Sequence, residues 1–169
     1  MIFRDEGIEV ALTKRLEEGK KCLVPYITGG FDGYLEAISA AADAGADAIE
    51  IGIPFSDPVM DGPTIQTAND IVLSNGITPA KILQDVGRLD VGIPLAVMTY
   101  YNVVYRFGLE RFSALLKESA ISGVIIPDLP FVETKPWAEA AKSNGIETIL
   151  LAAPTTTDEQ LIKICEESS

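Results

Sequence analysis

The chain has 169 residues, 47% of them hydrophobic, and its 25 acidic and 13 basic side chains give a formal net charge of −12. This length is enough for one ordinary domain with a sizeable core, and the negative charge argues against a nucleic acid or an anionic membrane as a partner. The sequence contains no histidine, which excludes His-based triads, His metal ligands and His acid–base catalysis. We therefore expect any acid–base chemistry to use carboxylates, Tyr, Lys or Cys.

The first residues, MIFRDE, contain no apolar run of the kind that forms a secretory signal. No later stretch approaches the roughly 20 consecutive apolar residues of a membrane span. We therefore expect a cytoplasmic protein without membrane segments, and we assign no residue as a metal ligand.

Short apolar runs alternate with helical patterns along the chain. An amphipathic segment around residues 10–16 comes first, and the runs follow at 22–27, 48–53, 93–100, 123–126 and 146–152. Apolar runs separated by helices are typical of a parallel sheet covered by helices. The spacing fits either a doubly wound sheet or an eight-stranded barrel. Because no GxGxxG follows the first run, we do not expect a Rossmann dinucleotide site.

The helical segments carry their own start and stop signals. Thr78 is a typical N-cap with Pro79 at the first helical position, Pro136 belongs in the first turn of a later helix, and residues 157–160 fit a capping box. We predict helices near 35–44, 65–73, 78–89, 109–116 and 136–144, and from 157 onward. We find no linker, and we predict a single domain over residues 1–169.

One run contains a charged residue. In IEIGIPFSDPVMDGPTIQ, residues 49–66, Glu50 stands between Ile49 and Ile51. Strand side chains alternate, so Glu50 points away from the helices if the isoleucines face them, which in a barrel is toward the interior. Burial raises the pKa of an unpaired carboxyl group and suits it to proton transfer. The alternative is a structural Glu that pairs with a buried Lys or Arg.

Other polar residues fall at the carboxyl ends of the runs, where parallel α/β folds place their active sites. Asp61 lies in the loop after the second run, although it could instead form a turn before Gly62 or cap a helix. Asp57 has the same alternatives. Further candidates to line a pocket there are Tyr26, Thr28, Tyr100, Asn102 and Asp128.

The stretch EIGIPFSDPVMDGPTIQ, residues 50–66, resembles the signature of the tryptophan synthase alpha subunit family. Supporting segments occur in the same order, namely VPYITG at 24–29, AGAD at 44–47, YYN at 100–102 and IPDLP at 126–130. The resemblance implies a (β/α)8 barrel that cleaves indole-3-glycerol phosphate to indole and glyceraldehyde 3-phosphate without a cofactor. Other phosphate-binding barrels of the same biosynthetic neighbourhood lack the PFSDP run followed by DGPT.

The resemblance places the two catalytic acids at Glu50 and Asp61. Glu50 would protonate indole C3 as general acid, and the Asp61 carboxylate would stabilise the positive charge that develops at the ring nitrogen. The resemblance also implies substrate-binding positions at Tyr26, Thr28, Met98, Tyr100, Ile125 and Pro127. It implies that the loop with Asp57 and Pro58 meets a beta subunit, in an α2β2 assembly.

Only five of the eight strands that the resemblance implies are present in this sequence. Strand six with its mobile loop, and the phosphate-holding loops after strands seven and eight, have no counterpart here. We therefore predict an incomplete (β/α) barrel of about five βα units, with open edges at its first and fifth strands. The alternative function is a catalytically inactive partial barrel that only binds the beta subunit or a complementary fragment.

Overall fold

Five parallel strands form one sheet in chain order, β1-β2-β3-β4-β5, in the computed structural model, which describes residues 7–168. The strands are β1 (Tyr26–Thr28), β2 (Ile49–Gly52), β3 (Leu95–Met98), β4 (Gly123–Ile125) and β5 (Glu147–Ile149). Every connection between neighbouring strands contains at least one helix. A sequential order of parallel strands is the arrangement of a (β/α) barrel, whereas a doubly wound sheet reverses direction within its strand order.

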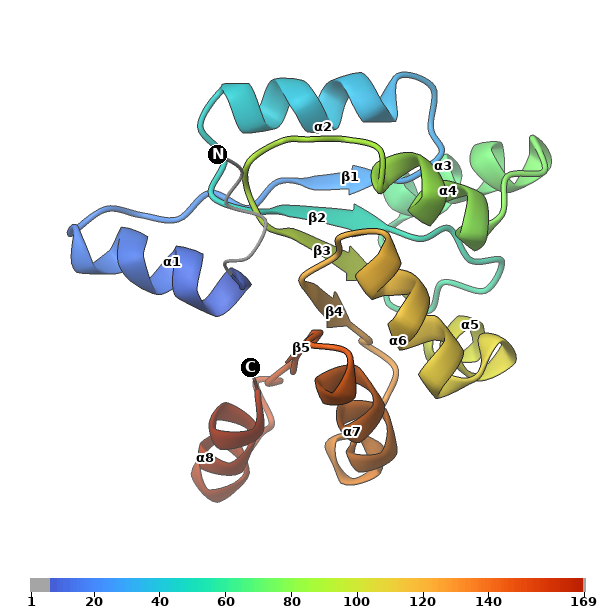
Figure 1. Ribbon diagram of the computed structural model, residues 1–169. Coiled ribbons are helices and arrows are strands. Elements are labelled where there is room, and N and C mark those ends of the chain that lie inside the picture. The colour runs from blue at the N-terminus through green and yellow to red at the C-terminus, as the bar shows by residue number, and fades with distance from the viewer. Residues whose placement is uncertain (1–6, 169) are drawn as a thin grey trace.

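Helices α2, α4, α6 and α7 lie along one side of the curved sheet, α3 and α5 lie near the carboxyl ends of the strands, and α1 lies near their starts (Figure 1). They are α1 (Ile8–Glu17), α2 (Tyr34–Asp43), α3 (Pro63–Ser74), α4 (Pro79–Val86), α5 (Tyr101–Phe107), α6 (Leu109–Glu118), α7 (Lys135–Ser143) and α8 (Asp158–Glu167), with a 3-10 helix at Phe131–Glu133. None of the helices within residues 7–168 has the length and apolarity needed to cross a bilayer.

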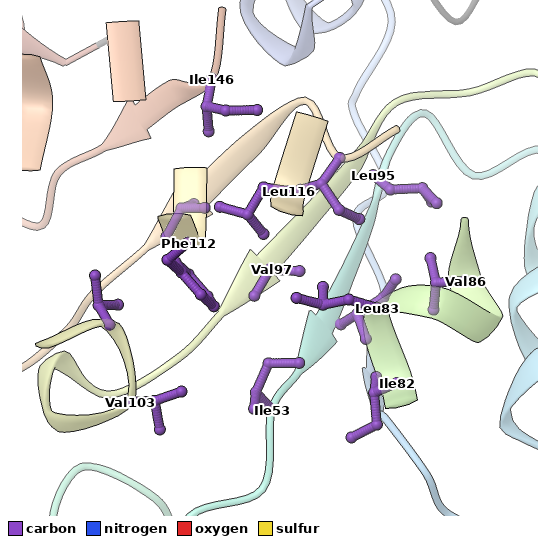
Figure 2. Packing of buried hydrophobic residues seen from close by; sticks show 14 of the residues in the cluster. Ile53, Ile82, Leu83, Val86, Leu95, Val97, Val103, Phe112, Leu116 and Ile146 are labelled. Atoms are coloured by element: carbon purple, nitrogen blue, oxygen red, sulfur yellow. The ribbon is translucent and has the colours of Figure 1, made fainter. Parts of the chain in front are cut away.

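The hydrophobic core lies between the sheet and these helices. Ile49, Ile51 and Ile53 are buried in it, which confirms the predicted orientation of the second strand. Figure 2 shows Ile53 and Val97 from the sheet side packed near α4 and α6 side chains that include Leu83 and Phe112. Alternation therefore turns Glu50 to the opposite, inner face of the sheet.

Two predicted helix starts are confirmed in detail. The Thr78 hydroxyl accepts a hydrogen bond from the Lys81 backbone N–H at 3.3 Å, with Pro79 opening α4. At α8, Thr157 and Gln160 form a reciprocal capping box. Both signals are local, because a cap needs only residues within one helical turn.

Helix α5 was not predicted. Its first backbone N–H, that of Tyr101, donates to the Asp128 carboxylate at 2.8 Å, and the helix ends at Gly108, where φ is +88°. Asp128 was expected to line a pocket, whereas its carboxylate caps this helix. The two residues of this contact are 27 positions apart in the sequence, so no local pattern predicts it.

The first strand is shorter and later than the predicted run at 22–27. The Leu23 N–H donates to the Asp47 side chain at 2.8 Å, and Pro25 has no N–H to donate. The Pro25 carbonyl still accepts a hydrogen bond from the Glu50 N–H at 2.9 Å. The chain therefore lies beside β2 at Pro25, but regular strand pairing begins only at Tyr26. The other four strands fall inside their predicted runs.

Helix α1 is tied to the sheet near the starts of the strands. The Glu147 carboxylate accepts hydrogen bonds from the backbone N–H groups of Ile8, at 2.6 Å, and Glu9, at 3.3 Å. Gly123 leaves room for the Ile8 side chain, since a Cβ on Gly123 would lie 2.7 Å from Ile8 Cδ1. At the other end of α1, Arg15 Nε lies 3.0 Å from an Asp47 carboxylate oxygen. Helix α1 thus covers the amino-terminal end of the sheet.

Candidate active site

Glu50 lies half-buried on the inner face of β2, paired in register with Tyr26 of β1 and Ala96 of β3. Burial raises the pKa of the Glu50 carboxyl group, and the negative charge of Asp61 raises it further. No Lys or Arg within residues 7–168 forms an ion pair with Glu50. The alternative of a structural Glu with a cationic partner is therefore not met in this part of the chain. A carboxyl group with a raised pKa holds its proton more readily than an ordinary Glu, which suits it to proton transfer.

Asp61 lies at the end of the loop that connects β2 to α3. Its backbone N–H donates to the Pro58 carbonyl at 3.0 Å, which closes a turn. The N-cap of α3 is Gly62, and no side chain caps this helix, so Asp61 is not its N-cap. Instead, one carboxylate oxygen of Asp61 accepts a hydrogen bond from Asn69 Nδ2 at 3.0 Å. The Asp61 carboxylate is thus oriented by the Asn69 side chain, and it does not cap the start of α3.

Tyr100 contacts the loop between β2 and α3. Its side chain is 1% exposed, and its ring stacks on that of Phe55 with centroids 5.1 Å apart. The Tyr100 hydroxyl accepts a hydrogen bond from the Met60 backbone N–H at 3.0 Å. Burial raises the pKa of Tyr100, and the negative charge of the neighbouring Asp61 adds to the rise. Tyr100 therefore lies beside Asp61 and anchors the residue that precedes it.

Tyr26 occupies the space that Gly52 leaves open. A Cβ on Gly52 would lie 1.9 Å from the Tyr26 hydroxyl oxygen, so only glycine is compatible with this position of the ring. The Tyr26 side chain therefore fills the space that the missing side chain at position 52 would occupy. Burial raises the pKa of the Tyr26 hydroxyl, with further contributions from the charges of Asp61 and Glu50. The three groups therefore gather at the carboxyl ends of β1 and β2.

Three of the remaining predicted substrate-binding residues, Thr28, Met98 and Ile125, lie along the same face. Strand register places Thr28, Gly52, Met98 and Ile125 in one row across β1 to β4. Met98 is buried, whereas Thr28, Ile125 and Pro127 are half-buried. The sheet thus arranges an apolar surface beside the two carboxylates.

Asp57 and Pro58 lie on the loop between β2 and α3, apart from this row. Asp57 is exposed and accepts a hydrogen bond from the Ser56 hydroxyl at 2.6 Å. The same loop exposes the side chains of Val59 and Met60. Its outer surface is therefore available for contact with another molecule.

Two polar partners of Asp61 were missed in the sequence. Asn69 donates to the carboxylate, and Gln66 Nε2 donates to the Asp61 backbone carbonyl at 2.9 Å. Asn69 could have been noticed, because with Ile65 and Val72 it follows the spacing of the buried face of a helix. Among residues 7–168, no group of three or more Cys, Asp or Glu side chains is arranged to hold a metal ion.

Comparison with known protein families gives one clear match. The sequence profile described as "Tryptophan synthase alpha chain" matches residues 12–169. The chain is 43% identical to the tryptophan synthase alpha chain of Streptomyces avermitilis, over 98% of this chain and 62% of the relative. It is 45% identical to that of Methanosarcina barkeri, over 90% of this chain and 59% of the relative. The chain thus spans about three-fifths of the length of these curated relatives.

Solved structures agree with the sequence comparison. A crystal structure of ligand-free tryptophan synthase from M. tuberculosis superposes with a TM-score of 0.90 at 32% identity, covering 96% of this chain and 67% of that chain. The tryptophan synthase alpha subunit of Legionella pneumophila superposes with a TM-score of 0.85 at 33% identity, covering 95% and 64%. The five-stranded sheet therefore matches about two-thirds of a known barrel.

Proposed function

The chain belongs to the tryptophan synthase alpha chain family, and on this premise we propose that it carries the acid pair of a carbon–carbon lyase. The proposed reaction is cleavage of indole-3-glycerol phosphate to indole and glyceraldehyde 3-phosphate, with no cofactor. The observation that carries this proposal is Glu50, a half-buried carboxyl group without a cationic partner within residues 7–168, whose pKa is raised by burial and by Asp61.

The proposed chemistry uses each carboxyl group differently. Protonated Glu50 gives its proton to indole C3, which places a positive charge on the ring nitrogen. The bond from C3 to the hydroxyl-bearing glycerol carbon then breaks, its electron pair returns to the ring, and the hydroxyl proton passes to the Glu50 carboxylate. The aldehyde forms at that carbon, and Glu50 is again protonated. The Asp61 carboxylate, held by Asn69, stabilises the cationic ring through its N–H.

The inner face of the sheet is the surface proposed to hold the flat, apolar indole ring. Tyr26, Met98, Tyr100, Ile125 and Pro127 are the side chains proposed to surround the indole ring, with Thr28 at the end of β1. In support of this, the strand register pairs Tyr26 with Glu50, and it places Met98 and Ile125 two residues further along the same face. Holding the ring here would bring C3 to the acid and lower the entropic part of the barrier.

The substrate phosphate needs groups beyond these. The sheet has five strands within residues 7–168, whereas the family resemblance puts the phosphate loops after strands seven and eight. We propose that lyase activity depends on those later βα units. We also propose that the loop with Asp57 and Pro58 binds the beta subunit, which would receive the indole.

Indole release tests the proposal directly. The purified chain is assayed with indole-3-glycerol phosphate alone, and again after addition of the last three βα units of the Streptomyces avermitilis relative as a separate polypeptide. We expect release only in the mixture, and none when the chain carries Glu50→Gln. Fast release by the chain alone would refute the assignment of phosphate binding to later strands. A mixture that assembles without releasing indole would refute the lyase proposal.

A second candidate function is binding without catalysis. Within residues 7–168, β1 pairs only with β2, and β5 pairs only with β4, so each leaves one edge available to another strand. A partial barrel of this kind would bind a complementary fragment or the beta subunit. Assembly of the mixture in the experiment above, measured by size-exclusion chromatography, separates binding from catalysis.

A further inference from the structure

Asn69 is a polar residue at a core position of α3. Its side chain is 2% exposed, and it shares the buried face of the helix with Val72, which is 1% exposed. A buried amide group that lacks hydrogen bonds destabilises the folded state. A hydrophobic residue of similar size, such as Leu, would avoid this cost. The presence of Asn at this position therefore calls for a role that an apolar side chain could not perform.

The amide makes one hydrogen bond toward the site. Asn69 Nδ2 lies 3.0 Å from Asp61 Oδ2, and a hydrogen bond to an ionised carboxylate is stronger than one between neutral groups. The other end of the amide, Oδ1, is buried and has no partner within residues 7–168. Turning the amide over would bring this oxygen against the carboxylate. The contact with Asp61 thus determines the orientation of the Asn69 amide, and in this orientation Oδ1 is left without a hydrogen-bond donor.

The loop backbone is held by other groups. Gln66 Nε2 donates to the Asp61 carbonyl, and the Tyr100 hydroxyl accepts from the Met60 N–H. The turn from Pro58 to Asp61 adds a third restraint. Loss of the Asn69 amide would leave these contacts in place, so its specific effect falls on the direction of the carboxylate.

We infer that Asn69 is a positioning residue, whose buried amide holds the Asp61 carboxylate in the orientation that catalysis requires. The inference rests on the proposed function, since it assigns Asn69 a part in the same reaction. Asp61 is proposed to stabilise charge that exists only after C3 is protonated, so misorientation weakens the transition state more than the bound substrate. The effect should therefore appear in kcat rather than in KM.

The diagnostic substitution is Asn69→Leu, which keeps the volume and removes the donor. In the chain assembled with the three complementary βα units, we expect kcat to fall about 10- to 100-fold, the cost of a misplaced catalytic group, with KM changed less than about threefold. The melting temperature should stay the same or rise, because the variant removes a buried acceptor without a partner. A purely structural Asn69 would show the reverse, with lowered melting temperature and unchanged kcat.

Asn144→Leu is the matched control. Asn144 is a half-buried asparagine, and its Nδ2 donates to the Ser113 hydroxyl at 2.9 Å, away from the carboxylates. We expect this variant to lower the melting temperature and to leave kcat unchanged. Equal kcat for Asn69→Leu and wild type would overturn the inference.

A second measurement keeps the inference testable if the lyase proposal fails. In the isolated chain, the 13C carboxyl signal of Asp61 is compared between wild type, Asn69→Leu and Asn144→Leu. We expect this signal to be displaced or broadened by Asn69→Leu alone, because the carboxylate gains rotamers. An Asp61 signal identical in all three proteins would overturn the positioning role, whatever the assay shows. Absence of indole release from the wild-type mixture would instead refute the proposed function.

Discussion

Glu50 and Glu147 occupy the same row of the sheet and have different partners. Strand register connects them through Ala96 and Gly123, so both side chains belong to the inner face, and burial raises the pKa of each. Both carboxylate oxygens of Glu147 accept hydrogen bonds from the start of α1, from the backbone N–H groups of Ile8 and Glu9. Glu50 has the Asp61 charge as its neighbour instead. Since burial is common to both residues, their partners are what separate the structural role of Glu147 from the chemical role proposed for Glu50.

The strongest test of this comparison replaces the ionisable carboxyl group of each glutamate with an amide. In the assembled mixture, Glu50→Gln should lower the rate of indole release by about 10²- to 10⁴-fold, the usual contribution of a general acid–base group. Binding of indole-3-glycerol phosphate should persist. Glu147→Gln, measured in parallel, should leave the rate within about twofold, because an amide oxygen can still accept from α1. Comparable rate losses in the two variants would remove the distinction.

Asp61→Asn sharpens the comparison inside the site. Loss of the charge opposite the cationic ring should cost roughly 3 kcal/mol of transition-state stabilisation, as for the removal of one preorganised electrostatic partner. The melting temperature should not fall, because the backbone turn and the contact with Gln66 do not need the carboxylate. If Asp61 is only a turn residue, the variant will unfold at lower temperature and retain normal kinetics in its folded fraction.

Glu147→Ala tests the structural member of the pair. The first N–H groups of α1 lose their acceptor, and substitution of a helix-capping group typically costs about 1 kcal/mol. Urea unfolding monitored by circular dichroism should record this loss, whereas Glu139→Ala, an exposed site on α7, should leave stability unchanged. A Glu147→Ala protein as stable as wild type would show that α1 is not held by this carboxylate.

The smallest expected effect is the pH dependence of stability at Glu50. Its pKa is raised in the folded state, so its contribution to stability is fully present below the pKa of the unfolded chain and is lost as pH rises through the folded pKa. Glu50→Gln should therefore be at least as stable as wild type at pH 7. This advantage should shrink as pH falls toward the pKa of an ordinary Glu. An advantage that grows with acidity would contradict the direction of the shift.

Much of the fold and the core of the candidate site follow from local patterns. Apolar alternation predicts that Ile49, Ile51 and Ile53 face the helices, and the same period turns Glu50 to the inner face. Capping residues predict the starts of α4 and α8, because the hydrogen bonds of a cap lie within one helical turn. The assignment of Asp61, by contrast, came from the family resemblance, because an Asp before a Gly is also a common turn.

Tertiary structure decided the partners of the polar groups. Helix α5 begins where Asp128 from another βα unit meets Tyr101, and α1 is fastened by Glu147, 139 residues from Ile8. The glycine at position 52 is required by Tyr26 on the neighbouring strand. The sequence by itself determined which face each side chain takes, because alternation and helical period are local. The hydrogen-bond partner of each carboxylate depends on groups that meet only when the sheet has formed. Tertiary structure therefore decides which carboxylates accept hydrogen bonds from the start of a helix, as Glu147 and Asp128 do.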